Sequence, residues 1–162
     1  MTRLLTLLIA VLAMGSAAAD NHLPFKVTEV TSFDEPWAMA FLPDGRILVS
    51  EKKGLLRVVG QDGQSFGIVR GVPDVDYGGQ GGLGDVVLHP DFEDNRWVYL
   101  SYSREEGDGS TTAISRGRLE NDRLTNVVEI FAAQAQGRAG HYGGKIVFDN
   151  GYMYLSLGDR QA

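Results

Sequence analysis

The stretch FLPDGRILVS at residues 41–50 ends one apolar strand, reverses the chain in a Pro-Asp-Gly turn and begins a second strand. The same order returns in LHPDF at 88–92, which resumes as WVYLS at 97–101, and again in FDNGYMYLS at 148–156. In each copy the second strand is rich in β-branched or aromatic residues and runs to a serine. Three copies of one hairpin pattern predict a chain built from repeated β units.

The serines of the three copies, Ser50, Ser101 and Ser156, lie about 50 residues apart. A period of this size is typical of a β-propeller, in which four-stranded blades bury their faces against one another. An ordinary β-sandwich with similar hairpins is the alternative that the pattern leaves open. Because propellers have about four to eight blades, we expect residues 20–162 to be the N-terminal part of a longer propeller.

The remaining sequence has the short, evenly spaced apolar runs of an all-β protein. Period-two alternation and β-branched residues, bounded by Gly and Asp-Gly turns, predict strands at 26–31, 46–50, 55–59, 84–88, 97–103, 113–119, 127–132, 145–148 and 152–157. In a closed propeller the run at 26–31 would complete the last blade. Helix is expected to be almost absent.

Residues 1–19 have the features of a cleavable signal peptide. Arg3 gives a positive start, residues 4–14 are apolar apart from Thr6, and three alanines at 17–19 precede Asp20. The apolar run is shorter than the roughly 20 residues that span a bilayer, so an uncleaved membrane anchor is the weaker alternative. We therefore expect a periplasmic or secreted protein with no stable membrane anchor.

Composition excludes several classes of partner and of catalytic chemistry. The chain of 162 residues has 21 Asp and Glu against 15 Lys and Arg, a formal net charge of −6, and no Cys. Nucleic acids and anionic lipids bind clustered Lys and Arg, so nucleic acid is not an expected partner. The absence of Cys excludes disulfides, thiolate catalysis and Cys-ligated zinc.

A glycine-rich segment at 77–85 (YGGQGGLGD) is the first candidate functional element. Five glycines surround Gln80 and let the backbone approach a ligand closely, while the Gln80 amide offers both a donor and an acceptor. A flexible connector between blades is the alternative. The segment is not a phosphate-binding P-loop, because the GxxxxGK[ST] pattern is absent.

The second candidate element is the pair His141 and Asp159. The hairpin at 145–157 would bring its outer ends together, so His141 could act as a general base that the Asp159 carboxylate orients. The alternative is that both residues only stabilise turns. His89 and His22 are expected to be structural or solvated.

The sequence gives only weak support for a calcium site or for a serine hydrolase. Asp74, Asp76 and Asp85 suggest a calcium loop, but their spacing does not match an EF-hand. A serine hydrolase is disfavoured because no GxSxG motif occurs.

Taken in order, several motifs of the chain resemble the glucose/sorbosone dehydrogenase family, and within it the soluble periplasmic PQQ-dependent aldose sugar dehydrogenases. These motifs are PWAMAFLPDG at 36–45, GQGGLGD at 79–85, HPDF at 89–92, HYGGK at 141–145 and LGD at 157–159. The resemblance implies a six-bladed β-propeller of which this chain covers roughly the first two blades and the start of the third.

The resemblance also implies roles for three residues. His141 would be the general base on the C1 hydroxyl of an aldose, which is oxidised to a lactone by hydride transfer to PQQ, and Asp159 would orient and stabilise His141. Gln80 would hydrogen-bond the quinone. Calcium ligands and the clamps for the quinone carboxylates are expected beyond residue 162, so no metal ligand is assigned here and this chain alone is expected to be inactive. An external electron acceptor would be a partner. A non-catalytic propeller module that binds carbohydrate or protein is the alternative function.

Overall fold

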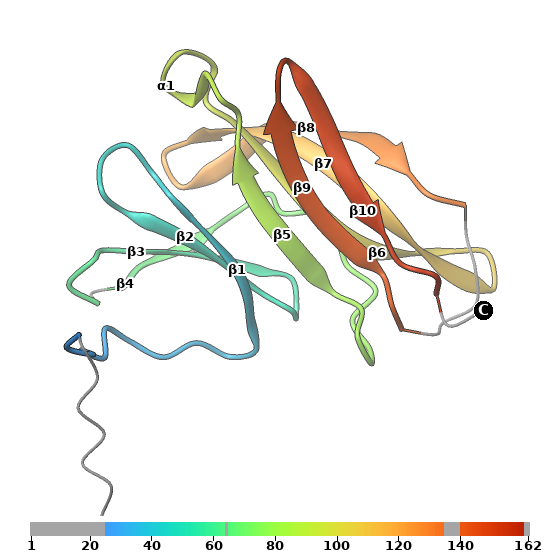
Figure 1. Cartoon of the computed structure of the whole chain (residues 1–162), viewed down its shortest axis with the longest axis horizontal. Coiled ribbons are helices and arrows are strands. Elements are labelled where there is room, and N and C mark those ends of the chain that lie inside the picture. Colours follow the sequence, from blue (N-terminus) through green and yellow to red (C-terminus); the bar gives the residue numbers. More distant parts are fainter. Residues whose placement is uncertain (1–24, 64, 135–139, 161–162) are drawn as a thin grey trace, which may run out of the picture.

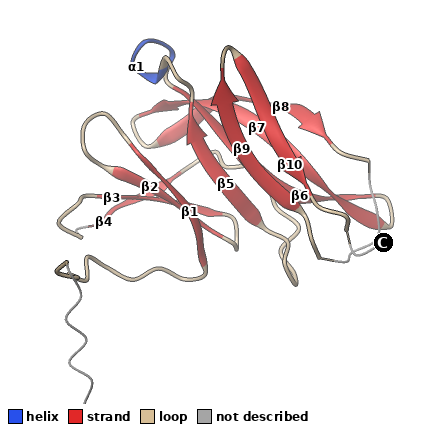
Figure 2. Ribbon diagram, in the orientation of Figure 1, coloured by secondary structure: helices blue, strands red, loops and turns tan. Residues whose placement is uncertain are grey.

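The structure is a computed structural model that describes residues 25–63, 65–134 and 140–160, and its regular elements are strands apart from one short helix (Figures 1 and 2). The first antiparallel sheet has the order β1 (Pro36–Phe41), β2 (Ile47–Glu51), β3 (Leu55–Val59) and β4 (Ser65–Val69). The second has the order β5 (Leu83–Leu88), β6 (Trp97–Glu106), β7 (Gly109–Glu120) and β8 (Arg123–Ala132), with α1 (Phe92–Asn95) between β5 and β6. A further antiparallel pair consists of β9 (Gly143–Asp149) and β10 (Tyr152–Leu157). The all-β prediction is confirmed.

Each copy of the repeated pattern is the first hairpin of a sheet. The three turns join Phe41 to Ile47, Leu88 to Val98 and Asp149 to Tyr152. Left-handed backbone serves the turns, as at Gly45 with φ of +86° and Gly151 with φ of +80°. The sequence repeat therefore corresponds to a repeated structural unit and is not a chance similarity of hairpins.

The three hairpins share one further detail, a β-bulge where the first strand pairs with the second. Register shifts occur beside Ala38, between Leu83 and Val86, and beside Leu155. In each hairpin the serine at the end of the repeat accepts a hydrogen bond from a first-strand N–H: Ser50 from Ala38 at 3.1 Å, Ser101 from Asp85 at 2.9 Å and Ser156 from Lys145 at 3.0 Å. The serine hydroxyl thus pairs a backbone donor at each bulge.

The strand predictions fail at two places. Residues 26–31 lie outside every strand of the described chain. Their two apolar residues, Val27 and Val30, are three positions apart, so the run also lacks true alternation. Alternation indicates which face a strand would bury, but a strand also needs a neighbour that takes up its hydrogen bonds. β4 was not predicted, because Gly67 with φ of +132° interrupts its pattern.

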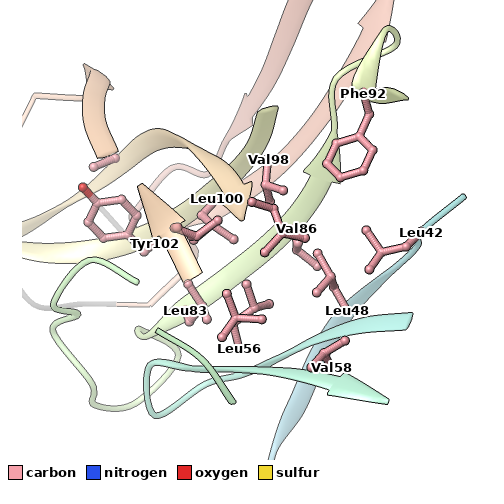
Figure 3. Packing of buried hydrophobic residues seen from close by; sticks show 14 residues of the cluster. Leu42, Leu48, Leu56, Val58, Leu83, Val86, Phe92, Val98, Leu100 and Tyr102 are labelled. Atoms are coloured by element: carbon pink, nitrogen blue, oxygen red, sulfur yellow. The ribbon is translucent and has the colours of Figure 1, made fainter. Parts of the chain in front are cut away.

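The main core lies between the two four-stranded sheets. Figure 3 shows Leu48 and Leu56 of the first sheet, with Leu42 directly after β1, facing Leu83 and Leu100 of the second sheet. These side chains are at most 4% exposed. Burying a large aliphatic side chain contributes about 1.5–3 kcal/mol to stability, so this contact fixes how the two sheets stack.

A second core repeats the arrangement one sheet further on. Ile114 of β7 and Ile146 of β9 are buried together with Tyr99. Through the first core β5 lies beside β1, and through the second core β9 lies beside β5 (Figure 1). Sheets that stack in chain order with neighbouring first strands are the arrangement of propeller blades. This stacking places the segments that precede β5 and β9, which contain Gln80 and His141, at the same end of the stack of sheets.

The predicted signal peptide lies outside the described residues, as does His22. Within residues 25–63, 65–134 and 140–160, no helix has the length and apolar character that crossing a membrane requires.

Candidate active site

His141 and Asp159 meet at the open end of the third hairpin. His141 lies two residues before β9 and Asp159 two residues after β10, and the pairing of Gly143 with Leu157 closes that end. The His141 Nδ1 atom is 2.7 Å from Asp159 Oδ1. Both side chains face solvent, with exposed fractions of 51% and 72%. A substrate could therefore reach the imidazole.

The backbone around this pair leaves little freedom. His141 has φ of +54°, in the left-handed region that a non-glycine residue seldom adopts. The Gly158 N–H donates to the carbonyl oxygen of Tyr142 at 3.2 Å, which joins the two chain segments directly. The strained conformation of His141 is thus held by the hairpin closure, as is common at functional sites.

Gln80 reaches the same place from the second sheet. Its Oε1 accepts a hydrogen bond from the backbone N–H of His141 at 2.6 Å. A Cβ placed on Gly140 would lie 2.5 Å from that oxygen, so a side chain at this position would displace the Gln80 amide from its present place. All three predicted site residues are therefore brought together. Gln80 contacts the His141 backbone, an arrangement that the sequence did not indicate.

The glycine-rich segment forms a tight turn. The Gly81 N–H donates to Gly78 O at 2.7 Å, and Lys52 Nζ donates to Gly79 O at 2.8 Å. Lys52 also lies 3.3 Å from Glu35 Oε1. Lys52 was not predicted, because a single lysine at the end of a hairpin carries no motif.

An ionisable pair flanks this lysine. The Tyr77 hydroxyl donates to Glu35 Oε2 at 2.6 Å. This hydrogen bond lowers the pKa of the Glu35 carboxyl and raises the pKa of the Tyr77 phenol. The carboxylate of Glu35 is thereby kept negative beside the Lys52 ammonium.

A cavity of about 190 Å³ lies between these elements. Its walls include Gln80, His141, Lys52 and Trp37, and much of the remainder is backbone contributed by glycines 81, 82, 84, 143 and 144. Complete small-molecule sites have volumes of about 300–1,000 Å³. The cavity is therefore large enough to hold only part of a cofactor, and it offers one wall of a site with an amide, an imidazole, a cation and an indole.

The candidate calcium residues do not gather in this region or elsewhere. Asp85 is buried, accepting the Ile146 N–H at Oδ2 (2.8 Å) and Lys145 Nζ at Oδ1 (3.1 Å). Across the described residues no group of three His, Asp or Glu side chains could hold a metal ion. The calcium loop suggested by Asp74, Asp76 and Asp85 is thus not formed, because Asp85 instead joins β5 to β9.

His89 has a structural environment. Its Nδ1 accepts the Asp91 N–H at 3.0 Å, and its ring lies 6.1 Å from the Tyr99 ring and 5.6 Å from the Phe148 ring. The structural role expected for His89 agrees with these contacts.

Two residues beside the His–Asp pair were also missed. The guanidinium of Arg160 lies 3.4 Å from the centre of the Tyr142 ring, and Arg160 is buried. Each is the chain neighbour of a predicted site residue, but no motif distinguishes an arginine or tyrosine that stacks from one that is solvated.

The sequence and structure were compared with known proteins. Residues 33–162 match the family described as Glucose / Sorbosone dehydrogenase. The chain is 44% identical over 133 residues to the aldose sugar dehydrogenase YliI of Escherichia coli (strain K12), a match that covers 78% of this chain and 36% of that protein. The chain thus spans little more than a third of this curated relative.

Solved structures agree. The soluble aldose sugar dehydrogenase (Asd) of Escherichia coli, crystallised in the apo form, has a TM-score of 0.75 and 41% identity, covering 78% of this chain and 38% of that one. The PQQ-bound aldose sugar dehydrogenase (Adh) of Streptomyces coelicolor has a TM-score of 0.70 and 26% identity, covering 82% and 40%. The sheets thus match part of propeller-fold dehydrogenases. Together with the family match over residues 33–162, this shows that the chain belongs to the glucose/sorbosone dehydrogenase family.

Proposed function

We propose that this chain provides the general base and one wall of the cofactor site of a PQQ-dependent aldose sugar dehydrogenase. The observation that carries the proposal is the 2.7 Å contact of His141 with Asp159, beside a glycine-rich turn whose Gln80 binds the His141 backbone. The names of the Escherichia coli and Streptomyces relatives support the substrate class and the cofactor.

The proton chemistry follows from the pair. When Asp159 accepts the Nδ1 proton of His141, the Nε2 atom is left with its lone pair and can take the proton of the aldose C1 hydroxyl. The carboxylate then stabilises the imidazolium that forms. Removal of this proton assists departure of the C1 hydride and gives the lactone.

The residues of the cavity wall fit the cofactor. PQQ, when bound, supplies the acceptor for the hydride. Gln80 has the amide donor for a quinone oxygen, Lys52 has a cation for an anionic cofactor, and the glycine backbone lets a flat ring approach closely. Calcium ligands and the carboxylate clamps are proposed to lie in further blades, and the chain alone to lack activity for that reason.

We also propose export to the periplasm or the medium and an external electron acceptor as a partner. These proposals rest on the sequence features of residues 1–19 and on the chemistry, since a reduced quinone must be reoxidised for turnover.

A chimera tests the function. Residues 33–162 would replace the matching segment of the Escherichia coli aldose sugar dehydrogenase, and the product would be assayed with PQQ, Ca²⁺, an aldose and an artificial electron acceptor. We expect PQQ-dependent reduction of the acceptor. His141→Asn should lower kcat by about 100-fold or more with PQQ binding nearly unchanged, whereas the control His89→Asn should keep most of the activity. Sugar binding without oxidation by a PQQ-loaded chimera would favour the non-catalytic binding module instead.

A further inference from the structure

The His141–Asp159 contact is one of two that join the same chain segments. His141 is followed by Tyr142, and Asp159 by Arg160. The first residues of these pairs make the exposed hydrogen bond at 2.7 Å, and the second residues stack with the guanidinium 3.4 Å from the ring centre. The polar contact faces solvent, whereas Arg160 is only 8% exposed.

The stack is anchored to β7 of the second sheet. Ser110 Oγ lies 2.5 Å from the Tyr142 hydroxyl, and Arg160 Nη2 donates to the same Ser110 Oγ at 3.2 Å. Thr112 Oγ1 donates to the Tyr142 carbonyl oxygen at 3.0 Å. Ser110 and Thr112 are buried, so these bonds are shielded from water. The stack therefore connects the loop ends of the third hairpin to a strand of the neighbouring sheet.

We propose that Tyr142 and Arg160 are positioning residues for the His141–Asp159 pair. The stack fixes the backbone of both segments from the buried side, and this holds His141 in its left-handed conformation with Nδ1 facing Asp159. A guanidinium that packs flat on a tyrosine ring is worth more when desolvated than at the surface. The planar group is required, because an ammonium has no face with which to cover the ring.

The inference rests on the proposed function for its catalytic meaning, but it has a readout that needs neither PQQ nor turnover. In the full 162-residue chain with ¹⁵N-labelled histidine, long-range ¹H–¹⁵N spectra distinguish imidazole protonated at Nδ1 from imidazole protonated at Nε2. His141→Asn assigns the signal. In its neutral form we expect His141 to carry its proton mainly on Nδ1, the atom that lies 2.7 Å from Asp159 Oδ1.

Arg160→Lys is the decisive variant, because it keeps the positive charge and removes the planar stack. We expect the ratio of the Nδ1–H to the Nε2–H form of His141 to fall about fivefold, the change that loss of one cation–π contact of about 1 kcal/mol produces. Arg116→Lys is the matched control. Arg116 also stacks on an aromatic ring, 4.6 Å from the centre of Trp97, but it lies on β7 outside the site, so the His141 signal should not change.

A wild-type ratio in a folded Arg160→Lys chain would overturn the proposal, since charge alone would then suffice. If the Arg160 variants do not fold, Ser110→Ala decides. It removes the shared partner and leaves both members of the stack, so we expect a fall of about twofold, and an unchanged ratio would refute the positioning role. A stack-dependent ratio combined with an inactive chimera would leave this inference standing and remove the proposed function.

Discussion

Gly158 lies directly against the carbonyl of His141. A Cβ placed on Gly158 would fall 1.8 Å from that oxygen and 2.5 Å from its carbon, closer than any real contact permits. The obstacle is backbone and cannot rotate away. The glycine before Asp159 is thus required by the residue that Asp159 binds.

Gly158→Ala should therefore separate the two ends of the third hairpin. We expect a loss of about 1–3 kcal/mol in the free energy of unfolding, the usual cost of added volume at a filled position, measured by urea denaturation. Gly78→Ala is the matched control, because nothing lies within 4 Å of its Cβ position. Equal losses in the free energy of unfolding for the two substitutions would show that the close approach of Gly158 to the His141 carbonyl does not limit stability.

Asp159→Asn tests the orienting carboxylate by activity. The amide keeps the size of the side chain but cannot stabilise the imidazolium of His141, which lies 2.7 Å away. We expect kcat of the chimera to fall by about 100-fold or more while KM changes little. The control Asp149→Asn alters an exposed carboxylate in the turn at the other end of the same hairpin. Undiminished kcat in Asp159→Asn would remove Asp159 from the mechanism.

Asp85 and Lys145 should contribute unequally to stability although they form one ion pair. Asp85 is buried and also accepts the Ile146 N–H, whereas the Lys145 side chain is 67% exposed. Asp85→Ala leaves that N–H without its partner and should cost about 1–3 kcal/mol, whereas Lys145→Met should cost less than about 1 kcal/mol. Urea denaturation of both variants and the double variant separates the two contributions. A larger cost for Lys145→Met would contradict this account.

Tyr102 predicts a pH dependence on the alkaline side. Burial, with a hydrogen bond to Glu129, raises the pKa of its phenol to about 12. The folded state then favours the neutral phenol over the range in which an unfolded tyrosine ionises. This stabilisation is complete below about pH 10 and is lost as the pH rises through about 12.

The Tyr102→Phe chain should consequently lose less stability than the wild type between about pH 10 and about pH 12. Urea denaturation at several alkaline pH values measures this difference, and absorbance at 295 nm should show that Tyr102 and Tyr77 ionise late among the six tyrosines. Tyr152→Phe, at an exposed tyrosine, is the control. Parallel pH curves for the wild type and Tyr102→Phe would exclude the shift.

Much of the fold could be predicted because its signals are local. Turn residues and alternation are properties of neighbours in sequence, so the strands at 55–59 and 152–157 have the predicted bounds. The run at 26–31 has β-branched residues but no partner strand among the described residues, and partnership is a long-range property that a local pattern does not encode.

In the candidate site, too, the local contacts could be predicted from the sequence and the long-range contacts could not. His141 and Asp159 stand at the two ends of one hairpin, so their proximity follows from the hairpin itself. The hydrogen bond from His141 to Gln80 and the contacts of Arg160 with Ser110 join residues 61 and 50 positions apart. Such contacts depend on how one sheet stacks on the next, which is decided by buried side chains and not by any motif.

The serines at the first two bulges also face the next sheet. Ser50 Oγ donates to Gly84 O at 2.6 Å, and Ser101 Oγ lies 3.0 Å from where a Cβ on Gly144 would be. In the first two units the bulge serine thus contacts the first strand of the following unit, at Gly84 and at Gly144. A gene segment coding for one such unit, once duplicated in tandem, would already encode both sides of the contact between the two copies, which are the bulge serine and the first strand. The architecture could lengthen during evolution without inventing a new interface.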